Sequence, residues 1–359
     1  MTIILIIANI NSNCFTGTVT GNGSIREEEK KITTIKELAE HLNVSVSTVS
    51  RALNDRHDIS VKTKKLILET ADKMNYKPSN IARSLVSNKT YTIGLMVPDI
   101  VDPFFSSIAV GVEEALYNSD YQVMYTSTGR SADKEGNFFR DVQNRQLDGV
   151  IVTPSLLDTQ TIERLKDLKV PAVLLRRRPP SNLNLPYVDV DHYRGACEIV
   201  NLLISKGHKK IGYLGISKES FTSNERQKGY IDTIQNYNLP FEDSFIEICG
   251  REFQDGREGI KRLYKNNPDI TAVFAGNDVL AIGALEWLAI NDISVPDQVS
   301  VIGFDDLEIS SLHWIQLSTM AQPRNEIGIQ AANLLLKMIE GAEAESIKLK
   351  TRLIERKTS

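Results

Sequence analysis

Cysteine is scarce in this sequence: Cys14, Cys197 and Cys249 are the only three among 359 residues, and no two form a Cys-x-x-Cys pair. Thiols so few and so far apart suit neither a disulfide framework nor a zinc site, and free thiols are typical of a reducing cytoplasm. The five histidines are scattered, without a His-Glu-x-x-His pattern. We therefore expect a cytoplasmic protein that holds no metal and no other cofactor.

Motifs of common α/β enzymes and of exported proteins are also missing. There is no Gly-x-x-x-x-Gly-Lys-[Ser/Thr], no Gly-x-Ser-x-Gly and no complete Gly-x-Gly-x-x-Gly. The apolar run Ile3–Ile10 is too short to cross a bilayer and lacks the positive flank and cleavage site of a secretion signal. These absences count against a membrane protein. They also count against an α/β enzyme and an exported solute-binding protein, which are kept as the two alternatives.

Residues 1–31 match no domain pattern. The run Arg26–Lys31 could be encoded by a purine-rich stretch like a ribosome-binding site, so one hypothesis is that translation starts near Ile32. The alternative is a disordered N-terminal arm. The intact mass of the natively expressed protein would decide, because finding residues 1–31 present would end the first hypothesis.

Charge is unevenly spread along the chain. Residues 31–90 hold 11 Lys or Arg and 6 Asp or Glu, a net charge of +5, which leaves −9 for the rest because the total is −4. A basic segment joined to an acidic body is the pattern expected when only that segment meets nucleic-acid phosphates.

The basic segment has the pattern of a helix–turn–helix. A first apolar stripe at helical spacing ends before Asn43, a residue that tolerates the left-handed conformation of a tight corner. Ser45 then suits the N-cap of a second helix, and Ser60 that of a third helix running to Met74. Residues expected to pack inward are Ile35, Leu38, Ala39, Leu42, Val49, Ala52, Leu53, Leu66, Ile67, Ala71 and Met74. The outward residues of the second helix form a short polar set that is typical of a recognition helix in the major groove. They are Val46, Ser47, Ser50 and Arg51.

Four motifs, in order, carry a resemblance to the lactose/galactose-repressor (LacI/GalR) family of transcriptional regulators. They are Val44–Arg51, Asn75–Pro78, Ala82–Leu85 and Val97–Phe105, and the likeness runs from about Thr33 to about Arg356. The resemblance implies a sequence-specific regulator, which we expect to be a repressor. In the family, a homodimer binds a near-palindromic operator in double-stranded DNA.

From Tyr91 onward, short apolar runs alternate with helical patterns, which is typical of parallel sheets covered on both faces. Ten strands in one sheet would be unusual, so we expect two Rossmann-like α/β lobes. The expected strands lie at 92–97, 122–126, 149–153, 172–175, 188–190, 211–214, 245–248, 272–275, 300–302 and 317–320. The resemblance likewise implies a periplasmic-binding-protein-like core with two lobes and a hinge, in which the helix after Pro323 crosses back to the first lobe.

The expected domains follow from these patterns and from the resemblance. An all-α helix–turn–helix head occupies 32–78, a hinge helix and linker 79–90, and an effector-binding and dimerisation domain 91–357. The N-lobe of that domain comprises about 91–190 and 322–345, and its C-lobe about 191–321 and 346–357.

The resemblance also assigns residues to DNA. Arg51 would bond a guanine edge, and Val46 and Ser47 would read neighbouring bases. Hydroxyls and lysines of the head would contact phosphates. A short helix at Asn80–Ser84 would order only on DNA, and Leu85 would wedge into the minor groove, the alternative being an ordinary linker leucine. The full set of expected DNA contacts is Thr34, Ser45, Val46, Ser47, Thr48, Ser50, Arg51, Asn54, Tyr76, Asn80, Ala82, Arg83 and Leu85.

Effectors of such a core bind beyond the carboxyl ends of the strands. Phe104 and Phe105 follow the first strand, where aromatic residues of the family contact the effector; plain core packing is the alternative. Asn277 and Asp305 follow strands of the second lobe, and Arg226 opens a helix there. Their family counterparts bond effector hydroxyls, whereas helix capping alone is the alternative.

One departure from the family concerns the residue after the strand at 172–175. Many sugar-binding members carry an aspartate there, whereas this chain reads Arg176-Arg177-Arg178. Arginine would pair with an anion, so we hypothesise that Arg176 binds a phosphate or carboxylate of the effector, such as a phosphosugar or a sugar acid. The alternative is that these arginines are solvated or pair across a dimer.

The chain ends at Ser359 without a heptad tail, so we expect a homodimer and not a tetramer. Effector binding would change the angle between the lobes, and a coupling of about 1–3 kcal/mol would suffice for regulation. Either release or promotion of DNA binding is compatible with this scheme, with or without a protein corepressor.

Overall fold

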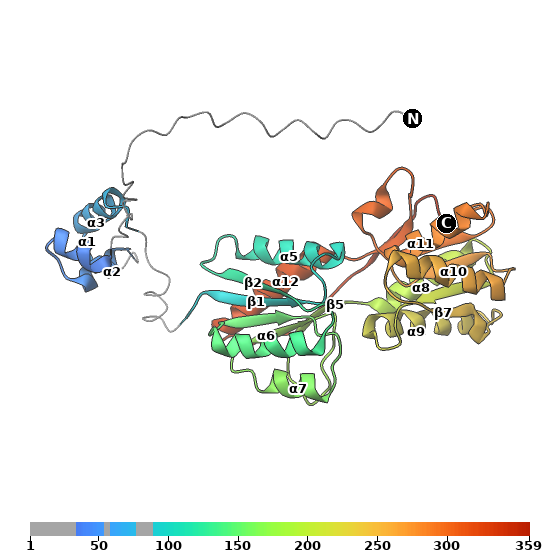
Figure 1. The fold of residues 1–359 in the computed structure, drawn as a ribbon, viewed down its shortest axis with the longest axis horizontal. Helices are drawn as coiled ribbons and strands as arrows, with labels where there is room; N and C mark the ends of the chain where they lie inside the picture. Colours follow the sequence, from blue (N-terminus) through green and yellow to red (C-terminus); the bar gives the residue numbers. More distant parts are fainter. Residues whose placement is uncertain (1–33, 54–57, 77–88) are drawn as a thin grey trace, which may run out of the picture. The chain divides into compact units, whose positions relative to one another are not determined.

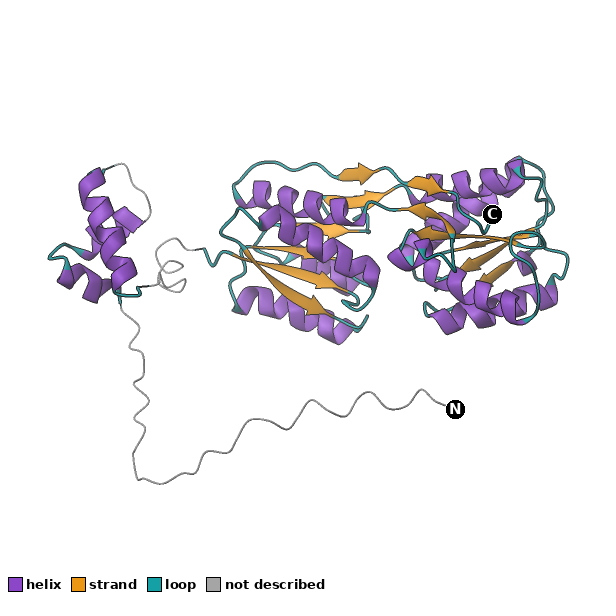
Figure 2. Cartoon of the chain, turned by 90° about the horizontal axis from the view of Figure 1, so that it is seen from above, coloured by secondary structure: helices purple, strands orange, loops and turns teal. Residues whose placement is uncertain are grey.

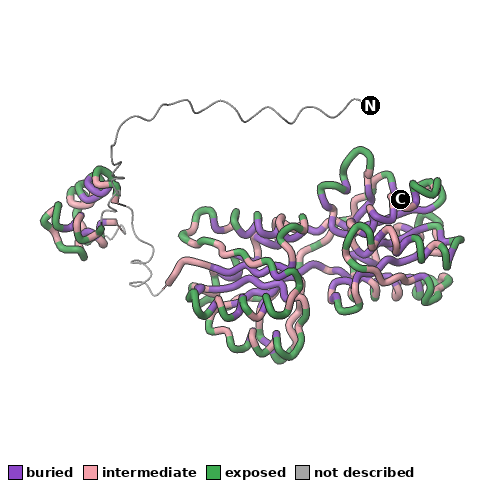
Figure 3. The backbone as a smooth tube through the Cα atoms, viewed as in Figure 1, coloured by how far each residue is buried: buried purple, intermediate pink, exposed green. Residues whose placement is uncertain are grey.

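The computed structural model describes residues 34–53, 58–76 and 89–359. The chain divides into two compact units, Met1–Ser79 and Asn80–Ser359. Figure 1 follows the chain by residue number, and Figures 2 and 3 show its secondary structure and its burial. The predictions made for Asn54, Asn80, Ala82, Arg83 and Leu85, and for residues 1–31, lie outside the described residues.

Three helices make up the described part of the first unit: α1 (Ile35–His41), α2 (Val46–Leu53) and α3 (Val61–Lys73). Asn43, at the corner between α1 and α2, has a φ of 52°, the left-handed conformation that the sequence predicted. Ser45 and Ser60 cap α2 and α3, because each hydroxyl oxygen accepts the amide three residues onward at 3.1 Å.

The core of this unit is formed by Leu38, Val49 and Ile67, which are almost fully buried. The prediction that Leu66 packs inward is wrong, because its side chain is 54% exposed. Successive helical residues are rotated by about 100°, so Leu66 points away from the face that contains Ile67. Thr70 lies on the buried face instead, and its hydroxyl donates to the Leu66 carbonyl at 2.8 Å, which satisfies the polar group.

Two six-stranded sheets form the second unit, one in each lobe (Figures 1 and 2). The first has the order β11-β5-β4-β3-β1-β2 and is parallel throughout; in the second, β12-β10-β9-β8-β6-β7, only β12 is antiparallel to its neighbour. The strands of the first sheet are β1 (Thr92–Val97), β2 (Gln122–Ser127), β3 (Gly149–Val152), β4 (Ala172–Leu175), β5 (Tyr187–Val190) and β11 (Ile347–Leu349). Those of the second are β6 (Ile211–Gly215), β7 (Ile246–Ile248), β8 (Ala272–Ala275), β9 (Ser300–Asp305), β10 (Ser318–Ala321) and β12 (Arg352–Ile354).

Helices cover both faces of each sheet, and Figure 3 shows the strands buried between them. In the first lobe, α5 (Pro103–Leu116) and α12 (Arg324–Ile339) pack on one face, and α6 (Ala132–Asn144) and α7 (Thr159–Lys166) on the other. In the second lobe, α8 (His192–Ser205) and α9 (Phe221–Asn236) lie opposite α10 (Phe253–Asn266) and α11 (Asp278–Ile290). Two short 3-10 turns, Asp243–Phe245 and Glu308–Ser311, complete the second lobe.

The chain passes between the lobes three times: after β5, after β10, and between β11 and β12. Helix α12 lies in the first lobe, as expected. The expected return to the second lobe at about residue 346 is wrong, because Ile347 and Leu349 pair with Val188 and Val190 of β5. The last crossing therefore comes only after β11, and hydrogen bonding to an existing strand edge holds the chain in the first lobe until then.

Candidate nucleic-acid face and effector cleft

Helix α2 presents the outward face that the sequence predicted, made of Val46, Ser47, Ser50 and Arg51. Arg51 Nη1 lies 3.2 Å from Asp58 Oδ2, and both side chains are more than half exposed. An exposed ion pair of this kind contributes about 0–1 kcal/mol to stability. Arg51 can therefore exchange Asp58 for another partner with little loss of stability.

Several other predicted DNA contacts already have partners inside the head. Thr34 caps α1, and its Oγ1 accepts the amide three residues onward at 3.3 Å. The Ser45 hydroxyl lies 2.7 Å from that of Ser47 and 2.8 Å from that of Thr48. Tyr76 packs against the buried cluster of the head, and burial raises its pKa. These side chains position α1 and α2, so any contact that they make with DNA is additional to a structural role.

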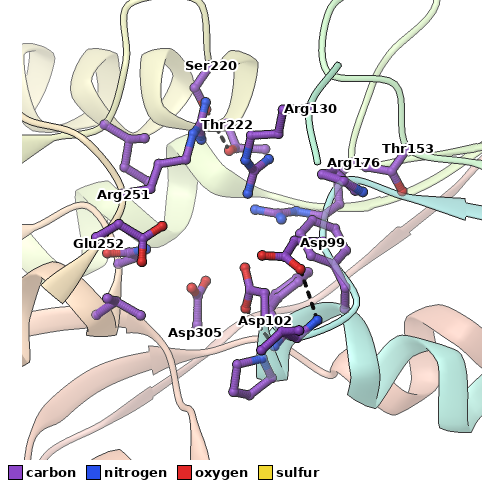
Figure 4. A pocket seen from close by; sticks show the side chains of 18 of the residues that line it. Asp99, Asp102, Arg130, Thr153, Arg176, Ser220, Thr222, Arg251, Glu252 and Asp305 are labelled. Carbon is purple, nitrogen blue, oxygen red and sulfur yellow. Dashed lines mark hydrogen bonds between the residues drawn. The ribbon is translucent and has the colours of Figure 1, made fainter. Parts of the chain in front are cut away.

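A cleft of about 1100 Å³, including its open mouth, lies in the second unit (Figure 4). Its walls come from the carboxyl ends of strands and the first turns of helices in both lobes, where open parallel sheets place their ligands. The structure brings all six residues that the sequence predicted for the effector into this one cleft. They are Phe104, Phe105, Arg176, Arg226, Asn277 and Asp305.

Phe104 and Phe105 belong both to the cleft wall and to the core of the first lobe. Their rings meet nearly edge to face, with centroids 5.3 Å apart. The guanidinium of Arg176 stands 4.1 Å from the Phe104 ring centroid, in a cation–π contact. Arg176 has a φ of 54°, a conformation that costs an ordinary residue about 1–2 kcal/mol, and its Nε is buried without a hydrogen-bond partner.

Arg226 is 1% exposed and is held by the second lobe from several sides. It donates to the carbonyl of Gly276, to Nδ1 of His192 at 3.2 Å and to Oδ1 of Asp305 at 3.4 Å. Its guanidinium lies 3.7 Å from the centroid of the Phe304 ring. Burial lowers the pKa of Arg226 and raises that of Asp305, and each of the two charges offsets the effect on the other. Most donors of Arg226 are thus in use within the protein.

Asn277 has the capping role that was one of its two interpretations. Its side-chain oxygen accepts the Leu280 amide at 2.9 Å at the start of α11, while the residue also lines the cleft. The next residue, Asp278, is fully buried and accepts one backbone amide and two hydroxyls at 2.5–2.8 Å. Burial, and then the carboxylate of Asp305, raises the pKa of Asp278 to about 6.

The two arginines after Arg176 have partners within the chain. Arg177 donates to the carbonyls of Pro154 at 3.1 Å and Ser155 at 2.7 Å, and so ties the loop after β3 to the loop after β4. Arg178 lies 3.6 Å from Glu225 of α9, an ion pair that joins the two lobes. Both arginines therefore have contacts within the chain, whereas the alternative that they pair across a dimer stays a prediction.

Several polar side chains of the cleft were not predicted from the sequence, among them Thr153, Arg130 and Arg251. They follow β3, β2 and β7, so the rule about strand ends that identified Phe104 would also have found them. Thr153 Oγ1 is buried without a hydrogen-bond partner. Burial lowers the pKa of Arg130, and burial together with Arg130 and Arg176 lowers that of Arg251 to about 10.

Within the part of the chain that the structure describes, no three His, Cys, Asp or Glu side chains gather as metal ligands would. None of the helices at 34–53, 58–76 and 89–359 is both long and apolar enough to cross a membrane.

Comparisons with known proteins match both units. Residues 34–79 match the bacterial regulatory proteins of the lacI family, and residues 90–357 match the periplasmic binding proteins and sugar binding domain of the LacI family. The chain is 35% identical over 316 residues to the HTH-type transcriptional regulator RegA of Clostridium acetobutylicum, covering 87% of this chain and 94% of that protein. It is 31% identical over 321 residues to the HTH-type transcriptional repressor CytR of Escherichia coli K12, covering 89% and 94%.

Among solved structures, the Lac repressor dimer bound to operator and the anti-inducer ONPF superposes with a TM-score of 0.83. The match covers 91% of this chain and 99% of that one at 23% identity, and it shows the fold: a helical head followed by a two-lobed α/β core.

Proposed function

This chain belongs to the LacI family of bacterial regulatory proteins, and on that premise we propose that it is a repressor that binds a near-palindromic operator as a homodimer. A small anionic sugar derivative in the cleft controls its affinity for DNA. One observation carries the proposal: an open recognition helix in the first unit accompanies a ligand-sized cleft in the second. Like RegA and CytR, the chain is a regulator of transcription and not an enzyme.

The proposed DNA complex places α2 in the major groove. Arg51 forms a bidentate contact with a guanine edge, and Val46, 41% exposed, packs against a thymine methyl. The proposed head comprises residues 32–78; the hinge helix and linker expected at 79–90 lie almost entirely outside the described residues. Because its target is the chromosome, the protein acts in the bacterial cytoplasm.

The proposed effector lies against side chains of both lobes. Phe104 offers an apolar ring face to a sugar ring. Asn277 uses its oxygen as a helix cap, which leaves its amide nitrogen to donate to a hydroxyl. Asp305 accepts from further hydroxyls, and Arg176, whose Nε has no partner, pairs with the anionic group.

Exposed apolar side chains support the homodimer. Val110 of α5 and Tyr117, the C-cap of that helix, are 49% and 86% exposed, and in the second lobe Leu312 and Trp314 are 48% and 88% exposed. Single exposed apolar residues are ordinary, but large ones grouped on both lobes are typical of a protein interface. Residues 91–357 therefore serve both effector binding and dimerisation.

Coupling between effector and DNA uses the three crossings between the lobes. The Arg178–Glu225 pair, at 3.6 Å, is one of the contacts that a change in lobe angle alters. A coupling free energy of about 1–3 kcal/mol between the two sites changes operator affinity about 5–150-fold. The effector acts as an inducer or as a corepressor, according to which lobe angle it stabilises.

Selection of bound fragments from a genomic library tests the proposal directly. The purified chain should enrich a few fragments that share a near-palindrome, and an anionic metabolite should change that enrichment. No preference for any duplex over random competitor, with or without metabolites, would refute it.

Calorimetric titration with neutral sugars and their acid or phosphate forms tests the ligand class. Tight binding of a neutral sugar with no preference for the anionic forms rejects the anionic effector.

A further inference from the structure

Three guanidinium groups in the cleft have no hydrogen-bond or ion-pair partner among the described residues. Within the described residues, Arg130, Arg176 and Arg251 form no side-chain hydrogen bond and no ion pair, although all three line the same cavity. Other arginines of the cleft differ in this respect, since Arg226 pairs with Asp305 and Arg177 donates to backbone carbonyls. The guanidinium N–H groups of these three arginines are therefore available to a ligand in the cleft.

These three arginines lie close enough to repel one another. Burial is the largest cause that lowers the pKa of Arg130 and Arg251; Arg176 lowers both as well, and Arg130 lowers that of Arg251, while the carboxylate of Asp102 acts in the opposite direction on both. Figure 4 shows Arg130 drawn between Arg251 and Arg176, with Asp99 and Asp102 just below them and Glu252 beside Arg251. Gathering like charges in a partly buried site is unfavourable unless an anion joins them.

The number of donors selects among anions. A carboxylate has one charge and two oxygens, which a single arginine can engage bidentately. A phosphomonoester carries about −1.5 to −2 charges at neutral pH and three terminal oxygens, enough for several arginine forks. Thr153 Oγ1, buried without a partner in the same cleft, adds one more hydroxyl to the polar wall.

We propose that Arg130, Arg176 and Arg251 form a phosphate site. This inference rests on the proposed function, and it implies that the effector is a phosphorylated sugar and not a sugar acid. Its phosphate lies among the three arginines, and its hydroxyls face Asp305 and Asn277. Arg130 and Arg176 belong to the first lobe and Arg251 to the second. The phosphate therefore holds both lobes at once and favours one angle between them.

Inorganic phosphate is the probe for the arginine site itself. Calorimetry on the full chain should show phosphate binding, with acetate at equal ionic strength binding at least about tenfold more weakly. Arg130→Gln and Arg251→Gln should each weaken phosphate binding about tenfold or more, and Arg130→Lys should retain part of it. The matched control is Arg257→Gln, which removes an arginine of α10 that pairs with Glu286 at 3.5 Å outside the cleft and should change nothing.

Three results would overturn the assignment: no phosphate binding, equal binding of acetate, or unchanged binding in both glutamine variants. Thermal unfolding of each variant checks that it is folded. If Arg130→Gln does not fold, Arg130→Lys still tests the site.

A second experiment titrates the operator complex with hexose phosphates, the matching hexoses and the matching hexonates. If the protein selects an operator but responds only to hexoses or hexonates, the phosphate site is rejected and the proposed regulator function stands. If it binds phosphate but selects no operator, the proposed function is rejected and the phosphate site stands.

Discussion

Arg226 Nη2 and His192 Nδ1 lie 3.2 Å apart in the buried interior of the second lobe. Arginine can only donate, so Nδ1 accepts and the proton of the neutral imidazole lies on Nε2. Nε2 faces Oδ1 of Asp189 at 3.0 Å. Asp189 is in β5 of the first lobe and His192 begins α8 of the second, so this chain of bonds passes through one lobe crossing and ends at the cleft.

The buried imidazole makes stability depend on pH. Burial lowers the pKa of His192 from 6.5 to about 4, so the unfolded chain takes up a proton in a range where the folded chain does not. The contribution of His192 to the free energy of unfolding is fully present above pH 6.5. It decreases by about 3 kcal/mol as the pH falls towards 4. Urea unfolding of the wild type and of His192→Gln between pH 4 and 7 measures this contribution. An unchanged pH dependence in the variant would contradict it.

Asp278 contributes with the opposite sign. Its pKa is raised from 3.8 to about 6, so the folded chain holds the proton more tightly than the unfolded one. Its contribution is therefore most favourable below pH 3.8 and falls by about 3 kcal/mol as the pH rises to 6. In Asp278→Asn this loss disappears, so the variant should gain stability with rising pH more steeply than the wild type. Urea unfolding between pH 4 and 6 measures this difference. Parallel pH dependences for Asp278→Asn and the wild type would contradict the contribution assigned to Asp278.

Arg51 should matter for DNA and hardly at all for folding. Its ion pair with Asp58 is exposed, so we expect Arg51→Ala to change the free energy of unfolding by less than about 1 kcal/mol. Loss of a bidentate guanine contact should weaken operator binding by about 1–3 kcal/mol, roughly 5–150-fold, and relax the preference at one base pair. Gel shifts on single-base operator variants measure both effects. Lys65→Ala, at the exposed Lys65–Glu69 pair on α3, serves as a charge-matched comparison.

Two glycines allow α5 and α12 to pack closely. A Cβ on Gly111 would lie 2.0 Å from the Asn325 carbonyl oxygen, and one on Gly328 would lie 2.1 Å from that of Ile108. Gly111→Ala must push the helix backbones apart, so we expect a loss of about 1–3 kcal/mol or more in the free energy of unfolding. Chemical denaturation measures it, with Ser107→Ala on the same helix as the control. Equal stability of both variants would mean that the helices separate freely.

Local signals predicted most of the fold. The apolar periodicity identified ten strands and the three described helices of the head, and the capping by Ser45 and Ser60 depends on residues only three positions away. Strands β11 and β12 were missed because three-residue edge strands carry too short a pattern. Leu66 was misplaced because hydrophobicity alone does not reveal that Thr70 can satisfy its hydroxyl within the helix.

The sequence by itself determined ten of the twelve described strands, the basic head and six residues that line the cleft, because periodicity, capping and family motifs depend on neighbouring positions. Only the tertiary structure decided that Arg130, Arg176 and Arg251 share one cavity, that Arg177 and Arg178 have partners within the chain, and that Asp278 and His192 are buried. Those facts depend on which loops meet when two sheets bring their carboxyl ends to a common cleft. Residues far apart along the chain then shift one another's pKa, and no local sequence pattern predicts that effect.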